Sequence, residues 1–247
     1  MNLWLESRSH PLLVAHRGAS AHAPENTLGA FALAMQQRAD AIELDVKRCA
    51  SGEVVVLHDH TVDRTTNGAG TVESLTLAQL RALDAGAGER IPTLDEVLDL
   101  IRPDPGFLIN IEITNYATPR DGLEHEVVEA VRRHKIGPRV LYSSFNHLLI
   151  RRMAKHDPDV PRALLYWAEG PLYLRNVWLS PFIRHEFRHP HYGMVTPPFV
   201  QKMHAAGRRI NVWTVNDETQ IRRMAAMGVD GIIGDSPLTM RRALGIE

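Results

Sequence analysis

The sequence predicts an α/β fold: a (β/α)8 TIM barrel with an extra antiparallel hairpin arm after its second strand and a small inserted subdomain. Short apolar segments typical of strands alternate with amphipathic helical segments from residue 12 to the C-terminus, which indicates a parallel sheet. About eight such repeats fit into 247 residues, the usual length of a barrel. No internal repeat or low-complexity tract divides the chain, so we expect residues 1–247 to form a single domain.

Nine segments have the composition of strands, and helical patterns lie between most of them. In the first helical pattern, Leu28, Phe31 and Met35 recur at helical spacing, and Asn26 is the expected N-cap. The nine strand candidates are LLVA (12–15), AIELDV (41–46), EVVVLH (53–58), FLINIEI (107–113), VLYSS (140–144), ALLYW (163–167), YGMVT (192–196), RINVWTV (209–215) and GIIG (231–234).

The third candidate cannot belong to the barrel. Only a short polar stretch separates Val46 from Val54, whereas a parallel crossover needs about a dozen residues or more. We therefore expect a hairpin that turns at residues 50–52, with its second arm antiparallel above the barrel mouth. This arm would bring His58 beside Glu43. Eight parallel strands remain, as a closed barrel requires.

Two segments are longer than simple connections. Residues 59–92 carry many turn signals and one short helical pattern at 77–83, so they are expected to form a small insertion over the barrel. Residues 170–192 are rich in aromatic and apolar side chains. This second segment could form a lip near the site, although ordinary packing on the barrel is the simpler interpretation.

Composition limits the possible partners and location. A net charge of -1 with interspersed signs gives no broad basic surface, which argues against nucleic acid as a partner. The single cysteine, Cys49, excludes an intrachain disulfide and indicates a reducing compartment. The N-terminus has no basic region followed by a long apolar stretch, and no apolar run reaches about 18 residues. We expect a cytoplasmic protein without stable membrane insertion, and its oligomeric state is left open.

Carboxylates collect at the ends of two predicted strands. Glu43 and Asp45 share one face of their strand because side chains alternate, and Asn110 and Glu112 share a face of the next barrel strand. Each of these carboxylates taken alone could cap a helix or pair with a lysine. Three together repel one another unless a cation lies between them, and hard oxygen ligands suit Mg²⁺ or Ca²⁺. The sequence therefore predicts a divalent-cation site at the barrel mouth.

Several motifs occur in an order that resembles one known family. They are HRG with PENT (residues 16–27), ELD (43–45), LHD followed by DRTTNG (57–68), IEI (111–113) and VWTVND (212–217). In this order the chain resembles the glycerophosphodiester phosphodiesterases of the phospholipase-C-like barrel superfamily, from about residue 12 to residue 237. The resemblance implies metal-dependent hydrolysis of a small-molecule glycerophosphodiester to glycerol 3-phosphate and an alcohol.

The resemblance also assigns roles to individual residues. A histidine next to an arginine suits proton transfer beside a phosphate, so the implied chemistry agrees with the residues themselves. The attacking group could be water or the neighbouring hydroxyl of the substrate glycerol, and the sequence leaves this open. The implied roles are general acid and base for His16 and His58, phosphate binding for Arg17, metal binding for Glu43, Asp45 and Glu112, and lining of the glycerol pocket for Trp213.

One position departs from the family pattern. The family usually has a lysine two residues after the third metal carboxylate, and this chain has Thr114 there. A hydroxyl supplies no charge, and the loss of a charge-assisted contact would cost about 1.5–3 kcal/mol. Lys47 lies on the same strand face as Glu43 and Asp45 and could compensate, or it could be a solvated residue of the hairpin arm. Lys47 and Thr114 are therefore candidate substrate-binding residues.

Other functions fit the sequence less well. A metal-dependent amide hydrolase would generally carry His-x-His on the first strand, whereas this chain has His-Arg-Gly. A phosphodiesterase or lyase that acts on a larger lipid phosphodiester remains an alternative, as does a catalytically weakened protein that binds glycerophosphodiesters. Retention of both histidines and all three carboxylates argues against a mere binder. His185, His189 and His191 have a spacing that fits no standard metal site.

Overall fold

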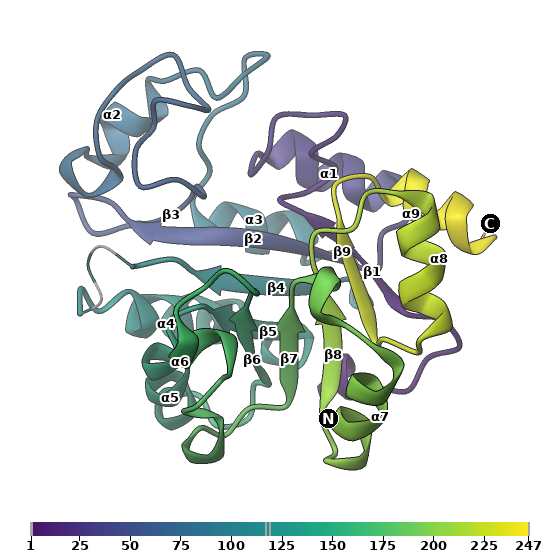
Figure 1. Cartoon of the computed structure of the whole chain (residues 1–247). Coiled ribbons are helices and arrows are strands. Elements are labelled where there is room, and N and C mark those ends of the chain that lie inside the picture. The colour runs from purple at the N-terminus through teal and green to yellow at the C-terminus, as the bar shows by residue number, and fades with distance from the viewer. Residues whose placement is uncertain (1, 117, 119, 247) are drawn as a thin grey trace.

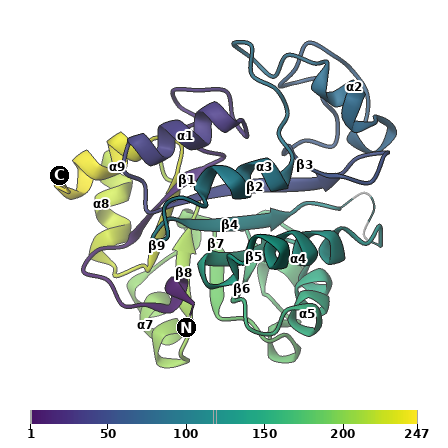
Figure 2. The ribbon, with the colours of Figure 1, turned by 180° about the vertical axis from the view of Figure 1, so that it is seen from behind.

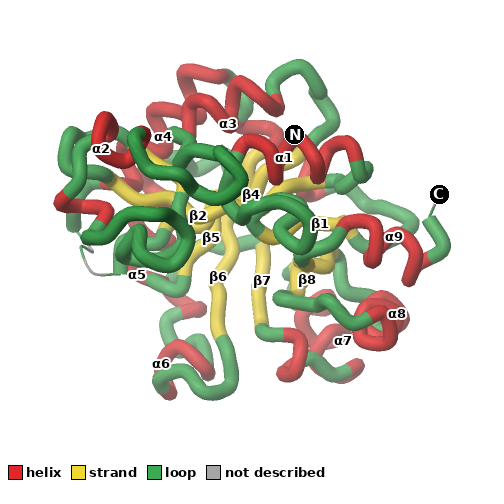
Figure 3. The backbone as a smooth tube through the Cα atoms, turned by 90° about the horizontal axis from the view of Figure 1, so that it is seen from above, coloured by secondary structure: helices red, strands yellow, loops and turns green. Residues whose placement is uncertain are grey.

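The computed structural model describes residues 2–116, 118 and 120–246, and its centre is a closed barrel of eight parallel strands. The strands follow the order β1-β9-β8-β7-β6-β5-β4-β2, and β2 pairs with β1 to close the ring. Seen from above, the strands gather in the centre of the molecule (Figure 3). The predicted barrel is confirmed. Its strands are β1 (Leu12–His16), β2 (Ala41–Arg48), β4 (Leu108–Ile113), β5 (Val140–Ser144), β6 (Arg162–Tyr166), β7 (Phe187–Pro190), β8 (Arg209–Val212) and β9 (Gly231–Gly234).

Helices surround the barrel and cover the outer faces of the strands (Figure 2). Their buried residues recur at helical spacing, as in α3, where Leu94, Val97, Leu98 and Ile101 face the core. In the described part of the chain no helix is both long and apolar enough to cross a bilayer. The helices are α1 (Leu28–Gln36), α2 (Leu77–Arg81), α3 (Leu94–Ile101), α4 (Leu123–His134), α5 (His147–His156), α6 (Leu172–Arg175), α7 (Pro197–Ala205), α8 (Glu218–Ala226) and α9 (Pro237–Leu244).

The first helix begins differently from the prediction. Thr27, not Asn26, is the N-cap of α1, because its side chain accepts a hydrogen bond from the backbone N–H of Ala30. Asn26 has a φ of 58°, outside the extended conformation that an N-cap residue adopts. Its side chain instead reaches the site described below.

The predicted strand at 192–196 is wrong. The seventh barrel strand is β7, Phe187–Pro190, and Tyr192–Met194 forms a short 3-10 helix. β7 carries Arg188 and His189, whose polarity hides the strand in the sequence. Inside a barrel, side chains that point inward are packed whatever their polarity, so alternation of hydropathy does not mark this strand.

The extra arm is confirmed as an antiparallel partner of β2. β3 (Val54–Val56) pairs with β2, with Val46 opposite Val56, and the turn is closed by a hydrogen bond from Gly52 N to Cys49 O of 3.0 Å. The following segment, residues 59–92, contains α2 and stands to one side of the barrel (Figure 1). Val62, Val72 and Leu80 of this segment pack with Val55 and Leu57 in an apolar cluster separate from the other core clusters.

Candidate active site

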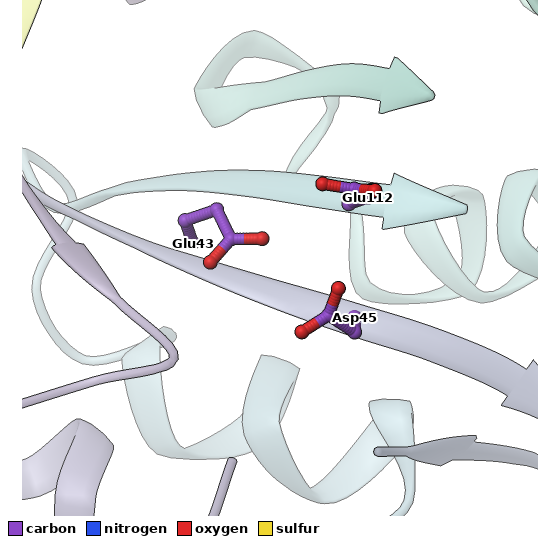
Figure 4. Close-up of side chains that lie close together, drawn as sticks. All are labelled: Glu43, Asp45 and Glu112. Carbon is purple, nitrogen blue, oxygen red and sulfur yellow. The ribbon is translucent and has the colours of Figure 1, made fainter. Parts of the chain in front are cut away.

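The three predicted carboxylates lie together on neighbouring strands. Asp45 on β2 lies opposite Glu112 on β4, and Glu43 lies two residues before Asp45 on the same face of β2 (Figure 4). One oxygen from each of the three lies within 4.8 Å of the others, and all three side chains are buried. Within the described residues, no other group of three or more histidine, cysteine or acidic side chains is placed to hold a metal ion.

Burial makes this cluster unfavourable without a cation. Burial and the charge of Asp45 raise the pKa of Glu43 well above its usual range, and the same two causes raise that of Glu112 to about 8. The side-chain oxygen of Asn110, beside them, is buried without a hydrogen-bond partner. Carboxylate and amide oxygens are the ligands that a hard divalent cation prefers, so these residues fit such an ion.

The turn after β1 brings Arg17 to the carboxylates. Its backbone N–H donates to Glu43 Oε2 (3.1 Å), and its guanidinium donates to Glu25 Oε1 (2.8 Å) and lies 3.4 Å from Asp45 Oδ2. Gly18 has a φ of 85°, and a Cβ there would lie 2.7 Å from the backbone of Ala30. The chain therefore needs glycine at this turn, which explains the third residue of HRG.

The first histidine is held by an aspartate that the sequence analysis missed. His16 Nδ1 lies 2.7 Å from Asp235 Oδ1, at the end of β9. Burial raises the pKa of Asp235, but the hydrogen bond and charge of His16 outweigh it and the net pKa is lowered. Asn216 also donates to Asp235. This carboxylate therefore fixes the ring orientation and leaves Nε2 for chemistry.

The second histidine has an equivalent partner. His58 Nδ1 lies 2.6 Å from Asp59 Oδ1, and Arg64 donates to the same carboxylate and to Glu25. The hydrogen bond from Arg64 is the largest cause that holds the pKa of Asp59 well below its usual range. Because Glu25 also binds Arg17, an ionic chain links the two histidine-bearing loops.

A small cavity of about 100 Å³ collects most of the predicted site residues. Its lining also includes Asn110, Phe145 and His189. The predicted residues that the structure brings together here are His16, Arg17, Glu43, Asp45, His58, Glu112 and Trp213. His58 and Glu43 therefore line the same cavity.

Lys47 and Thr114 lie outside this lining but next to each other. Lys47 on β2 lies two residues after Asp45, and Thr114, directly after β4, lies two residues after Glu112. Lys47 Nζ donates to Thr114 O (2.8 Å) and Thr114 Oγ1 (2.9 Å). Lys47 is buried, so it is not a solvated residue of the arm. Burial lowers its pKa, and the charges of Asp45 and Glu112 oppose that shift.

A second, larger cavity of about 670 Å³ adjoins the first and shares His58, Phe145 and Trp213 with it. The ring of Phe145 packs edge-on against Trp213, with ring centres 5.4 Å apart, and against Trp167 at 5.0 Å. The indole N–H of Trp213 donates to the backbone oxygen of His189 (2.8 Å), which fixes the ring between the two cavities.

The remaining histidine-rich segment is structural. Burial lowers the pKa of His189 to about 3 and that of His185 to about 4, so both are neutral. His189 Nε2 contacts Asn211, and His191 accepts a hydrogen bond from Gly193 N. They form no metal group in the part of the chain that the structure describes.

Four further residues support the site and were not predicted as site residues. Asp235 follows the last barrel strand directly, a position that could have identified it. Asn26 of PENT donates to Asp45 Oδ2 (3.0 Å), so this motif touches the carboxylates directly. The hydroxyl of Tyr116 donates to Glu112 Oε1 (2.8 Å) from a loop with no sequence signal. Asp59 belongs to the LHD motif.

Comparisons with known proteins agree with this geometry. The profile of the glycerophosphoryl diester phosphodiesterase family matches residues 16–239. A glycerophosphodiester phosphodiesterase of Caldanaerobacter subterraneus subsp. tengcongensis is 42% identical over 237 residues, which cover 93% of this chain and 96% of the relative. An Oleispira antarctica phosphodiesterase, solved in complex with the product sn-glycerol-3-phosphate, superimposes with a TM-score of 0.84 at 30% identity, covering 96% of this chain and 97% of that one. A glycerophosphodiester phosphodiesterase of Agrobacterium tumefaciens gives a TM-score of 0.79 at 30% identity, covering 94% and 99%. The chain belongs to the glycerophosphoryl diester phosphodiesterase family and is a phosphodiesterase.

Proposed function

We propose that this enzyme hydrolyses glycerophosphodiesters to glycerol 3-phosphate and an alcohol, with a divalent cation and with His16 and His58 as general acid and base. One observation carries the proposal: two histidines, each oriented by an aspartate, line the same small cavity as Arg17 and three buried carboxylates. The product named for the Oleispira antarctica relative, sn-glycerol-3-phosphate, supports the same substrate class.

The site's own residues supply proton transfer and charge. One imidazole takes the proton of the attacking oxygen, and the other gives a proton to the departing alkoxide, while Arg17 faces the charge that builds on the phosphoryl oxygens. Glu43, Asp45 and Glu112 would hold Mg²⁺ or Ca²⁺, which supplies further positive charge at the phosphate when bound. Trp213 forms a flat wall for the glycerol carbons.

Lys47 takes over the charge that the family places at position 114. Two of its three N–H groups donate to Thr114. In this proposal the third donates to an anion held beside Asp45 and Glu112, whose charges act on Lys47. In this proposal, Thr114 orients Lys47 rather than replacing it. In this proposal the charge stands on β2, at Lys47, instead of at position 114, directly after β4.

The proposed substrates are glycerophosphodiesters derived from phospholipids, so the role proposed for the enzyme is in lipid and glycerol metabolism. A cytoplasmic location accords with the single cysteine. The proposed hydrolysis depends on neither the metabolic role nor the location.

The test is release of glycerol 3-phosphate from glycerophosphocholine by purified protein with Mg²⁺, with Ca²⁺ and with EDTA. Metal-dependent release that EDTA abolishes would support the proposal. Folded protein that releases no product with either metal would contradict it and would favour a protein that only binds such diesters. Equal release with EDTA would contradict metal dependence alone.

A further inference from the structure

The catalytic cavity is too small for a whole glycerophosphodiester. Its volume of about 100 Å³ is well below the roughly 300–1,000 Å³ of pockets that enclose a whole small-molecule ligand. A phosphoryl group beside the carboxylates would fill most of it. The substituents of the phosphorus must therefore extend outward, and the shared wall of His58, Phe145 and Trp213 leads into the cavity of about 670 Å³.

The chemistry of this larger cavity suits an apolar group. Eight of its eleven lining residues are leucine, phenylalanine, tyrosine or tryptophan, and no aspartate, glutamate, lysine or arginine is among the described residues that line it. Aromatic rings could hold a quaternary ammonium, but a choline group would occupy only a small part of the volume and would find no carboxylate partner there. A hydrocarbon chain would match both the size and the lining.

The segment that forms one wall of the cavity carries further apolar side chains. One wall comes from the segment 172–182, which contributes Leu174 and Leu179 to the lining. Exposed apolar side chains of this kind, gathered in one place, mark a contact site for an apolar ligand or surface. The same segment and the neighbouring α5 expose Leu148 (53%), Leu172 (60%), Tyr173 (50%), Trp178 (59%) and Phe182 (74%).

We propose that the enzyme accepts, and prefers, glycerophosphodiesters whose glycerol carries one acyl chain, that is, single-chain lysophospholipids. This inference rests on the proposed function and names its substrate class. The chain would lie in the larger cavity while the phosphate stays among the carboxylates. Overall, one water adds: the phosphorus gains an oxygen from water, its bond to the head-group alcohol breaks, and the alcohol leaves with a proton. The products are an acylglycerol phosphate and the free alcohol.

The test compares kcat/KM, measured by choline release, for glycerophosphocholine and for its acetyl, hexanoyl and decanoyl esters on the glycerol, all below the concentration at which they form micelles. Burial of each methylene should raise kcat/KM by about two- to fourfold until the cavity is full. We expect the decanoyl ester to exceed the acetyl ester by at least about tenfold. Glycerophosphoethanolamine and its decanoyl ester serve as a second pair.

A matched pair of variants separates the cavity from general surface effects. Leu148 and Leu238 are both the second residue of a helix and are 53% and 50% exposed, but only Leu148 lines the cavity. Leu148→Asn combined with Leu174→Asn should reduce the decanoyl preference by at least about fivefold without changing turnover of glycerophosphocholine. Leu238→Asn should change neither.

Each outcome either supports or overturns the inference that the larger cavity holds an acyl chain. A rise with chain length that the cavity variant removes supports the inference. Hydrolysis of glycerophosphocholine with no rise along the series, or a preference that follows the head group instead of the chain, overturns the inference and leaves the proposed function standing. Hydrolysis of none of these compounds overturns both.

Discussion

The His16–Asp235 pair gives the sharpest quantitative prediction. The two side chains are only 21% and 32% exposed, and their atoms lie 2.7 Å apart, so the hydrogen bond is weakly screened. A charge-assisted bond of this kind contributes about 1.5–3 kcal/mol. If it acts mainly when His16 carries a proton in the transition state, Asp235→Ala should lower kcat by about 10- to 150-fold. KM should change little, because Asp235 does not line the catalytic cavity.

The assay is steady-state release of glycerol 3-phosphate from glycerophosphocholine at saturating metal. Asp235→Asn keeps a neutral acceptor and should lose about half of this free energy, so its kcat should fall between those of the wild type and the alanine variant. The control is Asp95→Ala, which removes a similar contact, 2.7 Å from His134 Nε2, on the outside of the barrel and should leave kcat unchanged. A kcat for Asp235→Ala within twofold of the wild type would refute the reasoning.

Three further predictions concern the other parts of the site. Asp59→Ala should lower kcat by only about two- to fivefold, because the His58–Asp59 pair is more exposed than the pair at His16; a loss as large as that of Asp235→Ala would contradict this. Lys47→Met should lower kcat/KM by about 10- to 100-fold, and adding Thr114→Lys to this variant should restore part of the loss. An unchanged kcat/KM in Lys47→Met would exclude a catalytic role for the charge of Lys47. Without metal, in EDTA, the pKa of Glu112 in the folded protein is raised to about 8, so the folded state binds this proton more tightly than the unfolded state does. The free energy of unfolding should therefore fall as pH rises from about 4.5 to about 8. In urea denaturation, Glu112→Gln should make the free energy of unfolding depend less on pH, and Mg²⁺ should restore the stability that is lost at high pH. An unchanged pH dependence in the variant would contradict the raised pKa of Glu112.

Much of the barrel was predictable because its strands are apolar runs separated by helical patterns. The hairpin arm was predictable from chain length alone, since too few residues separate Val46 from Val54 for a crossover. β7 was missed because His189, which lines the cavity inside the barrel, and Arg188, on the opposite face of the strand, leave neither face apolar. Boundaries such as the start of α1 depended on whether Asn26 or Thr27 adopts the extended conformation, which the sequence does not determine.

The site, like the fold, could be predicted from the sequence only in part. The carboxylates of β2 and β4 could be placed together because strand alternation fixes their faces and parallel strands end at one edge. The partner of His16 could not, because Asp235 reaches it across 219 positions of sequence. The contact between Arg64 and Glu25, which are 39 positions apart, could not be predicted either. Tyr116 donates to Glu112 from beyond the end of β4, and its ring packs edge-on against Phe145, which is 29 positions away in the sequence. Contacts of this kind arise only when the barrel closes.

The most direct test of the central claim is turnover of glycerophosphocholine by the His16→Ala, His58→Ala double variant at saturating Mg²⁺. Without either imidazole, kcat should fall by at least about a thousandfold. The thermal midpoint and its increase on addition of Mg²⁺ should stay close to those of the wild type, since all three carboxylates remain. A folded, metal-binding double variant that turns over glycerophosphocholine within tenfold of the wild-type rate would contradict catalysis by these histidines.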